Sequence, residues 1–337
     1  MKKCMVLFLT VFITISLLQS DLLAQKKLAQ TGFQFLSVGT DARATAMGEA
    51  FTTVEGSSTA LFYNPAGMAR VNTFLDLSMN QMTWIADIKY LSGSMSLNIG
   101  DRKYGVFGIS FLTIDYGEFI FTRVANTERG FEDIKGWPDP SAYMVGLGYA
   151  KELSDKFSVG GQVKYVTQNL SKSIVPIYAE RDQMIGTEEK DYTLQVAAFD
   201  FGTLYKTGFK SLAFGMSVRN FSREVKYEKE GFQLPLTFKI GISMNAVDLF
   251  PSFADNHALN LSIDAVHPRD FPEYLNIGGE YVFMNMLALR AGYISNQDDY
   301  NFTTGFGVKQ FGFEFDYSYT PFDIFDNVNR LSVRLSF

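Results

Sequence analysis

The stretch that decides the fold is Phe157-Ser158-Val159-Gly160-Gly161-Gln162-Val163-Lys164-Tyr165. Its odd positions are apolar, apart from Gly161, and its even positions are Ser, Gly, Gln and Lys. This period of two is typical of a strand with one face in an apolar medium and the other against small or polar groups. Residues 211–219 and 331–337 follow the same rule, so the pattern recurs along the chain.

Extending this pattern outward predicts an all-β protein, a fourteen-stranded antiparallel transmembrane β-barrel with a short N-terminal helical plug. Tyrosines near the ends of the segments fit the aromatic girdles of such a barrel, namely Tyr104, Tyr149, Tyr165, Tyr281, Tyr293 and Tyr317. A soluble β-protein is the weaker alternative. The strands are expected at about 72–80, 88–99, 104–123, 141–151, 157–169, 191–206, 211–220, 235–247, 258–266, 274–283, 287–294, 302–309, 311–320 and 329–337.

The joins between these segments alternate in length, as expected of short periplasmic turns and longer outer loops. The turn at 248–257 is longer than its periplasmic place suggests. The short joins fall at 100–103, 152–156, 207–210, 285 and 310, and the longer ones at 124–140, 170–190, 221–234, 295–301 and 321–328.

The first 24 residues predict a secretory signal peptide, because Lys2-Lys3 precede an apolar run from Met5 to Leu18 and Ala24 offers a small residue for cleavage. The barrel would then lie in the outer membrane, in contact with its lipid. The chain has 337 residues and a net charge of −6, which argues against a nucleic-acid partner. We expect three parts: the signal peptide (1–24), an N-terminal plug (25–70) and the barrel (71–337).

The chain holds two histidines and one cysteine, which leaves few residues for metal or thiol chemistry. We expect no cofactor, no metal site and no enzymatic activity. His257 and His267 fall at opposite ends of one predicted strand, without a Gly-x-Ser-x-Gly motif for a nucleophile. The acidic stretch 186–191 favours a solvated outer loop over a calcium loop.

The plug is predicted where the alternation is absent. Residues 40–48 favour a short helix with Thr40 or Asp41 as N-cap and Gly48 near its end, and 57–63 favour a second short piece. The turn after it joins the plug to the first strand, or else forms a gate in the permeation path. The candidate plug residues are Asp41, Arg43, Met47, Gly48, Asn64, Pro65, Ala66 and Gly67.

Seven charged residues have the parity of the polar face, so they must face the lumen, since each would cost a few kcal/mol in lipid. Arg43 of the plug could join them. They would form either an ion-pair network that fixes the plug or a selectivity or binding site. The seven are Asp200, Lys239, Asp264, Glu280, Arg290, Asp316 and Arg334.

Several stretches together resemble the PorV/PorQ family, although each alone is weak. Residues 35–70 look like its N-terminal signature, and the terminal Phe337 completes the likeness. The other matching stretches are Leu234-Pro235-Leu236-Thr237 with Gly241, Asn276-Ile277-Gly278-Gly279-Glu280-Tyr281, Leu289-Arg290-Ala291-Gly292-Tyr293 and Asp316-Tyr317-Ser318-Tyr319.

This resemblance implies a FadL-like barrel that is an accessory or shuttle component of type IX protein secretion. Its partners would be a secretion translocon and exported proteins with C-terminal sorting domains. Passive transport of hydrophobic small molecules, as in FadL-like relatives, is the alternative. Phe337 resembles the signal read by the outer-membrane assembly machinery. Aromatic and apolar residues of the outer loops would suit a protein partner: Trp137, Pro138 and Tyr143 at one end, Phe322, Ile324 and Phe325 at another.

Overall fold

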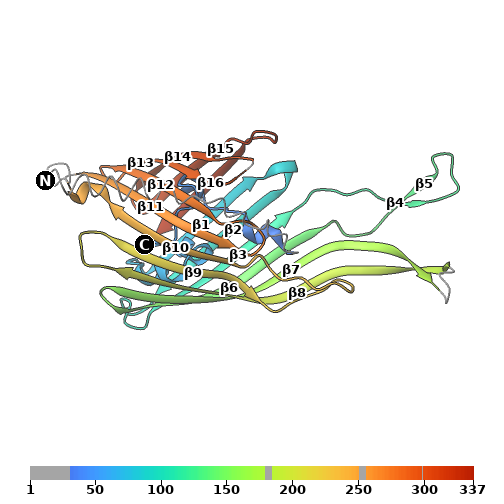
Figure 1. Cartoon of the computed structure of the whole chain (residues 1–337), viewed down its shortest axis with the longest axis horizontal. Coiled ribbons are helices and arrows are strands. Elements are labelled where there is room, and N and C mark those ends of the chain that lie inside the picture. The colour runs from blue at the N-terminus through green and yellow to red at the C-terminus, as the bar shows by residue number, and fades with distance from the viewer. Residues whose placement is uncertain (1–30, 179–183, 250–255, 298) are drawn as a thin grey trace, which may run out of the picture.

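The computed structural model describes residues 31–178, 184–249, 256–297 and 299–337. Fourteen antiparallel strands form a closed barrel in chain order, and β1 pairs with both β2 and β16 (Figure 1). The barrel strands are β1 (Leu75–Thr83), β2 (Lys89–Asn98), β3 (Val106–Asp115), β6 (Ser141–Ser154), β7 (Phe157–Tyr178), β8 (Met184–Lys206), β9 (Ala213–Ser222), β10 (Thr237–Asn245), β11 (His257–Pro268), β12 (Tyr274–Phe283), β13 (Leu287–Ile294), β14 (Phe302–Gln310), β15 (Phe313–Thr320) and β16 (Val328–Ser336). The predicted fold class is confirmed.

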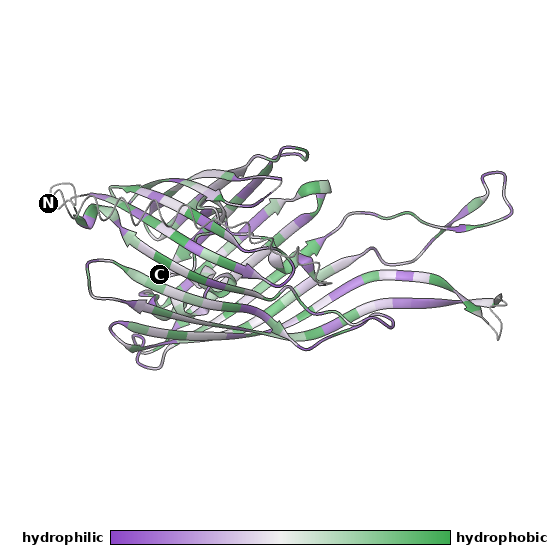
Figure 2. Ribbon diagram, in the orientation of Figure 1, coloured by the Kyte–Doolittle hydropathy of each residue, from purple (hydrophilic) through white to green (hydrophobic). Residues whose placement is uncertain are grey.

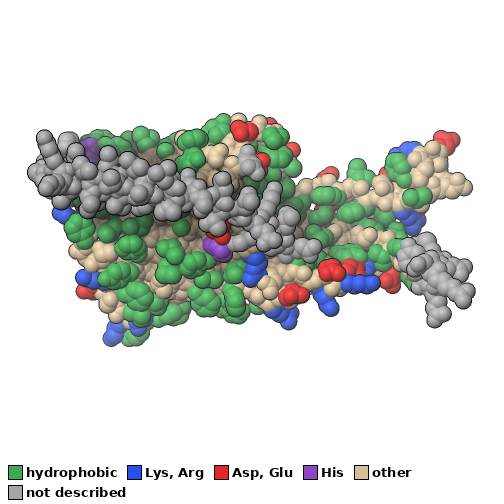
Figure 3. Space-filling view, viewed as in Figure 1, with side chains coloured by type: hydrophobic (Ala, Val, Ile, Leu, Met, Phe, Trp, Pro, Cys, Tyr) green, Lys and Arg blue, Asp and Glu red, His purple; other side chains and the backbone are tan. Residues whose placement is uncertain are grey.

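Alternation along the strands separates the two faces of the wall. In β6 the outward residues Val145 and Leu147 are exposed while the inward residues Ala142 and Met144 are buried. Figure 2 shows the same green and pale or purple alternation along the barrel strands, and apolar side chains cover much of the visible outer wall in Figure 3. The exposed apolar face is the surface that a transmembrane barrel presents to lipid.

The strand predictions fail in the long joins. Residues 170–178 and 184–190 were expected in a loop but continue β7 and β8 as a two-stranded ribbon beyond the barrel (Figure 1). The strand expected at 104–123 ends at Asp115, and a separate hairpin follows, β4 (Phe121–Val124) with β5 (Phe131–Ile134). Outside the membrane neither face of a ribbon borders lipid, so the period of two weakens while the backbone pairing continues.

The two ends of the barrel differ. At the short-turn end lie the brief joins such as Phe311-Gly312, the start of β1 and the end of β16. At the long-loop end lie the ribbon, the β4–β5 hairpin and the 223–236 loop (Figure 1). Two joins at this second end are nonetheless short: 84–88, which holds η4 (Ile85–Asp87), and 269–273. The long turn at 248–257 begins with η5 (Ala246–Leu249) and lies largely outside the described residues.

Residues 31–71 form the plug, which runs inside the barrel from one end to the other. Thr31 bridges to Gln233 at the long-loop end, whereas Arg70 donates to the Asp155 carbonyl at the short-turn end. Most plug residues are buried. The plug contains η1 (Gln34–Ser37), α2 (Ala42–Ala46), η2 (Ser58–Phe62) and η3 (Pro65–Arg70). No helix in the described part of the chain is long and apolar enough to cross a membrane. The predicted signal peptide lies outside the described residues.

Candidate functional site

Helix α2 seats the middle of the plug against one side of the barrel. Asp41 caps it by accepting a hydrogen bond from the Ala44 N–H at 2.8 Å. Arg43 donates from Nε and Nη2 to the two oxygens of Glu280 on β12, both at 2.8 Å, a bidentate pair. Met47 is buried at the end of the helix, and the Gly48 N–H donates to the Thr303 hydroxyl on β14 at 3.1 Å.

An ion-pair network surrounds this contact. Arg290 on β13 donates to Glu280 at 2.7 Å and to Asp316 at 2.6 Å, and all three side chains are buried. Glu314 on β15 lies 3.8 Å from Arg290 and 3.1 Å from Arg334. The structure therefore brings four of the seven lumen candidates into one connected cluster with the plug.

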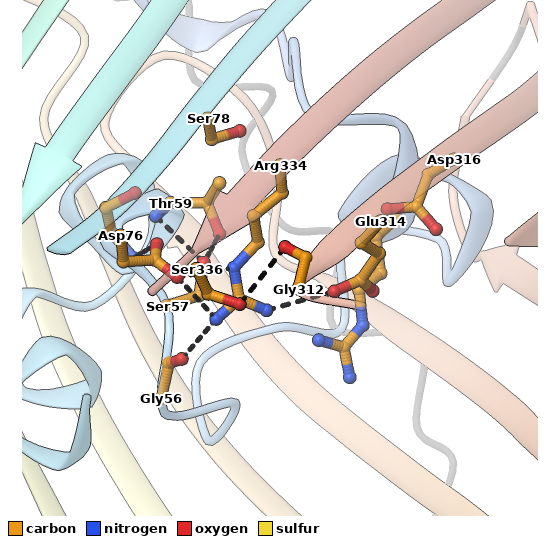
Figure 4. A network of polar contacts seen from close by, with 12 residues as sticks. Gly56, Ser57, Thr59, Asp76, Ser78, Gly312, Glu314, Asp316, Arg334 and Ser336 are labelled. Atoms are coloured by element: carbon orange, nitrogen blue, oxygen red, sulfur yellow. Dashed lines mark hydrogen bonds and ion pairs between the residues drawn. The ribbon is translucent and has the colours of Figure 1, made fainter. Parts of the chain in front are cut away.

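Arg334 extends the cluster to the seam between the first and last strands. Its guanidinium pairs with Asp76 on β1 at 2.7 Å and also donates to the Gly56 carbonyl of the plug. Figure 4 shows Arg334 between Asp76 and Glu314, with Gly56 below. One arginine thus contacts β1, β15 and the plug from β16.

The other three lumen candidates lie apart from that cluster. Asp264 accepts hydrogen bonds from the Phe51 and Thr52 N–H groups and the Thr52 hydroxyl, so it anchors the plug backbone. Asp200 pairs with Lys164 at 2.7 Å in the wall, beside a β-bulge between β8 and β9. Lys239 lies 3.5 Å from Glu49.

The Asn64-Pro65-Ala66-Gly67 segment is held by hydrogen bonds of the asparagine. Asn64 accepts from the Ala66 N–H and donates to the Thr52 and Thr203 carbonyls, which caps η3 and ties it to β8. Pro65 stands at the start of η3, and Ala66 and Gly67 are buried within it. These contacts support the structural reading of the motif, because every polar group of the Asn64 side chain has a partner inside the wall.

A cavity of about 300 Å³, here called the mouth cavity, lies between the start of the plug and the long-loop end. Its apolar wall includes Trp84, Tyr300 and Phe322, whose rings pack together with centroid distances of 4.5 and 5.4 Å. Burial raises the pKa of Tyr300 to about 12, so its hydroxyl is neutral at physiological pH. The polar lining is formed by Gln34, Glu49, Arg219, Thr237, Lys239, Asp270, Asn276, Gln297, Asp299 and Arg330.

A second cavity, of about 330 Å³, lies on the other side of the plug. Arg43 and Met47 of the plug line it, together with Lys206 and Lys210 near the short-turn end. The plug thus separates a cavity at one end of the barrel from a cavity at the other.

The two histidines considered for catalysis lie at opposite ends of β11 and contact different partners. His257 contacts the Tyr281 hydroxyl at 2.7 Å at the start of β11, and His267 pairs with Glu273 at 2.9 Å near its end. The acidic stretch 186–191 is part of β8 and not a loop, and its Glu189 pairs with Lys172 at 2.6 Å. Among the described residues, no group of three or more His, Cys, Asp or Glu side chains is placed to hold a metal ion.

Two of the predicted loop aromatics are not exposed on a loop: Tyr143 lies in a strand, and Phe322 is buried within its loop. Tyr143 belongs to β6, where it faces outward beside Tyr165. Phe322 is buried against Trp84 and Tyr300, because it closes the mouth cavity. Ile324 and Phe325 are exposed in the 321–327 loop.

The remaining three candidates are Trp137 and Pro138 in the long loop and Phe337 at the end of β16. Trp137 packs against Phe121 in the 116–140 loop, with the rings tilted and their centroids 5.4 Å apart, and Pro138 follows it. Phe337 ends the seam by exchanging backbone hydrogen bonds with Leu75. Its role as an assembly signal stays a prediction.

Sequence reasoning did not select several residues that shape the site. Arg219, Asn276 and Arg330 line the mouth cavity, and Asp76 and Glu314 complete the ion-pair network. All five lie at strand positions with the parity of the inner face, and this parity is the one feature of the sequence that could have pointed to them. Parity alone does not separate a residue beside a cavity from one within a network.

A comparison with family models decides the family. The model described as type IX secretion system membrane protein PorP/SprF matches residues 140–330, more than half of the chain. The chain belongs to the PorP/SprF family. The expected PorV/PorQ membership is therefore wrong. No curated protein matches the chain.

The physical reason for the error lies in what the quoted motifs do. Gly278 and Gly292 of those motifs lie against Met47 and Gly48 of the plug. Such residues report how closely a plug packs in a barrel. Close packing of this kind is a property of the plugged barrel and does not by itself identify one family.

Solved structures similar to this PorP/SprF-family chain are FadL-like barrels. The Ralstonia pickettii toluene transporter TbuX is 12% identical with a TM-score of 0.57, covering 89% of this chain and 98% of that one. The Pseudomonas putida toluene transporter TodX is 13% identical (TM-score 0.55, covering 93% and 99%). A Pseudomonas aeruginosa FadL homologue is 11% identical (TM-score 0.54, covering 93% and 100%). These likenesses show the fold, which is that of an outer-membrane barrel.

Proposed function

We propose that this barrel is a non-enzymatic accessory component of type IX protein secretion that recruits exported proteins at the outer face of the membrane. The observation that carries the proposal is the PorP/SprF family match, whose description names a membrane protein of that secretion system. The matched region includes the ribbon of β7 and β8 and most of the long-loop end.

The shape of the long-loop end supports recruitment of a protein. The ribbon extends beyond the last β6–β7 pair at Ser141 and Asn169, and the β4–β5 hairpin reaches out beside it (Figure 1). Trp137 donates to Glu189 at 3.3 Å, so the long loop touches the ribbon. Side chains on this projection have both charges (Figure 3), which suits a wet, polar interface with a protein.

The test is a gentle-detergent pull-down of the full barrel from its own outer membrane, followed by mass spectrometry. Recovery of a translocon barrel, or of exported proteins that share a C-terminal domain, supports the proposal. A variant with residues 171–191 replaced by a two-residue turn should lose these partners. A variant lacking the β4–β5 hairpin tests the other projecting element, and retention of the partners by that variant assigns recruitment to the ribbon. Recovery of the barrel alone contradicts the proposal.

Passive transport of hydrophobic small molecules is the second candidate. The observation in its favour is that Tyr274 lines both the mouth cavity and an apolar groove of about 540 Å³ on the outer wall, formed by β10 to β12 and the loop after β13. Lipid-like molecules bound in the purified barrel, with no protein partner, would favour this function.

A further inference from the structure

The mouth cavity contains buried polar atoms that have no hydrogen-bond partner. Lys239 Nζ and both polar atoms of the Asn276 side chain are of this kind, and the two residues are 3% and 1% exposed. Arg219 Nε is a third unpartnered group in the lining. A buried donor or acceptor without a protein partner costs free energy comparable to a lost hydrogen bond, so such groups in a cavity must be satisfied by water or by a ligand that displaces it.

The donor or acceptor character of these unpartnered atoms indicates which groups a ligand would need. Lys239, Arg219 and the Asn276 amide nitrogen are donors, and two of them are cations; the Asn276 carbonyl oxygen is an acceptor. Three donors beside one acceptor match a carboxylate that has an N–H group next to it. Glu49 lies 3.5 Å from Lys239 and balances part of its charge, but no hydrogen bond joins them.

The rest of the lining is suited to an apolar side chain. Trp84, Tyr300 and Phe322 form an aromatic wall, and Leu36 and Val38 of the plug add aliphatic surface. The acidic Asp270 and Asp299 come from the loops around the mouth. The volume of about 300 Å³ is at the lower end of small-molecule sites.

We propose that the mouth cavity binds the carboxyl-terminal unit of an N-acylated amino acid with an apolar or aromatic side chain. The carboxylate contacts Lys239 and Arg219, the amide N–H donates to Asn276 Oδ1, and the side chain packs on the aromatic wall. The same chemistry occurs in a free acylamino acid and in the last residue of a peptide. The inference does not rest on the secretion role, because it concerns the barrel alone.

The test uses the fluorescence of Trp84, since the chain has only two tryptophans and Trp137 is outside the cavity lining. The full barrel carrying Trp137→Phe is titrated in detergent with N-acetyl-4-nitrophenylalanine, whose nitrophenyl ring quenches tryptophan. Its C-terminal amide and 3-(4-nitrophenyl)propionate, which lacks the N–H group, are the comparison probes. We expect the acid to bind at least about tenfold more tightly than the amide, the factor typical of a charge-assisted hydrogen bond.

Variants identify the groups responsible. Lys239→Met should remove the preference for the acid, and Asn276→Leu should remove the advantage over the propionate. Lys206 lines the cavity on the other side of the plug, so Lys206→Met is the matched control. It should change neither the preference for the acid over the amide nor the advantage over the propionate. Heat-modifiable migration in gels shows that each barrel is folded, and Arg219→Gln serves if Lys239→Met does not fold.

Equal quenching by acid and amide overturns the proposal, and so does a preference that survives both Lys239→Met and Arg219→Gln. A hexapeptide ending in 4-nitrophenylalanine then separates the two sources. Binding of the peptide acid over its amide indicates a chain end as the ligand, whereas binding of the acylamino acid alone indicates a small molecule. Loss of partners in a pull-down would leave these results unchanged, so this inference and the proposed function fail separately.

Discussion

The plug is fixed to two sides of the barrel by different sets of buried contacts. Toward β11–β16, close packing at Gly278 and Gly292 is joined by a buried ion-pair network that centres on Arg43, Glu280 and Arg290. Toward β2–β8 the contacts are close packing, where Leu61 and Met68 belong to a buried apolar cluster with wall residues such as Val106. Gly160 lets the backbone at Pro65 approach the wall so closely that a Cβ would lie 2.5 Å from the Pro65 carbonyl carbon.

The two sides should therefore be sensitive to different kinds of substitution. The charged side depends on every partner, because removal of one leaves a buried charge without compensation. The packed side depends on volume, because it has no spare space. Substitutions that alter charge at constant size should therefore act mainly on the β11–β16 side, whereas the β2–β8 side should respond mainly to changes of size.

The largest effect is expected from Arg290→Met. This change leaves the buried Glu280 and Asp316 without their shared cation, and breaking a buried pair costs about 3–5 kcal/mol. Denaturant unfolding of the barrel in lipid vesicles measures the loss. Arg102→Met is the control, because its pair with Glu152 at 3.0 Å is partly exposed and should contribute less than about 1 kcal/mol. Equal losses in the two variants would count against the charged anchor.

The outer face of the wall is a third environment, because it borders lipid, where a charged side chain is costly and the plug makes no contact. Val333→Arg places a cation on the exposed face in the middle of β16 and should cost about 2–4 kcal/mol. Leu335→Arg, closer to the membrane edge, should cost only about 0–1 kcal/mol. Folded yield and vesicle unfolding check both. A larger loss for Leu335→Arg would mean that the membrane midplane lies closer to the short-turn end.

On the packed side, Gly160→Val should cost about 1–3 kcal/mol, because the new side chain must push η3 away from the wall. Gly161→Val is a matched control in the next residue of β7, where a Cβ would have its nearest neighbour at an ordinary 3.4 Å. Unfolding in vesicles gives the difference between them. Identical behaviour of the two valine variants would show that the plug does not press on this strand.

A smaller loss than that of Arg290→Met is expected from Glu280→Gln, which keeps the size but removes the charge that Arg43 and Arg290 share and turns one accepting oxygen into an NH2 donor. We expect normal insertion, a loss of roughly 1–2 kcal/mol, and a looser plug. Conductance across planar bilayers should rise. If the Glu280→Gln barrel stays as closed as the parent, the bidentate pair with Arg43 does not hold the plug in place.

The sequence predicted the parts of the molecule that lipid constrains. All fourteen strands were predicted in the right order, and eleven of them have bounds within a few residues of the observed ones, because an apolar outer face and a polar or small inner face force a period of two; the bounds of β3, β7 and β8 are wrong at the long-loop end. Local chemistry predicted the α2 cap as Thr40 or Asp41, and the structure has Asp41. The ribbon at 170–178 and 184–190 was missed, because water on both faces removes the pattern while the backbone pairs continue.

For the site, strand parity predicted which charges face inward but could not predict their partners. Glu280 and Lys239 have the same pattern in the sequence, yet one is in a bidentate pair and the other lies beside a cavity with an unused donor. Pairing depends on how far each strand is offset around the barrel and where the plug runs. Neither can be read from alternation within single strands.

The position of Arg334 has a consequence for the order of biogenesis. It belongs to the last strand to be synthesised, and it contacts the first strand through Asp76 and the plug through Gly56. Its full set of contacts exists only when the sheet is closed and the plug is in place. Barrel closure and plug seating thus stabilise each other through Arg334, and a barrel closed without its plug would leave the Arg334 guanidinium in the seam without the Gly56 carbonyl.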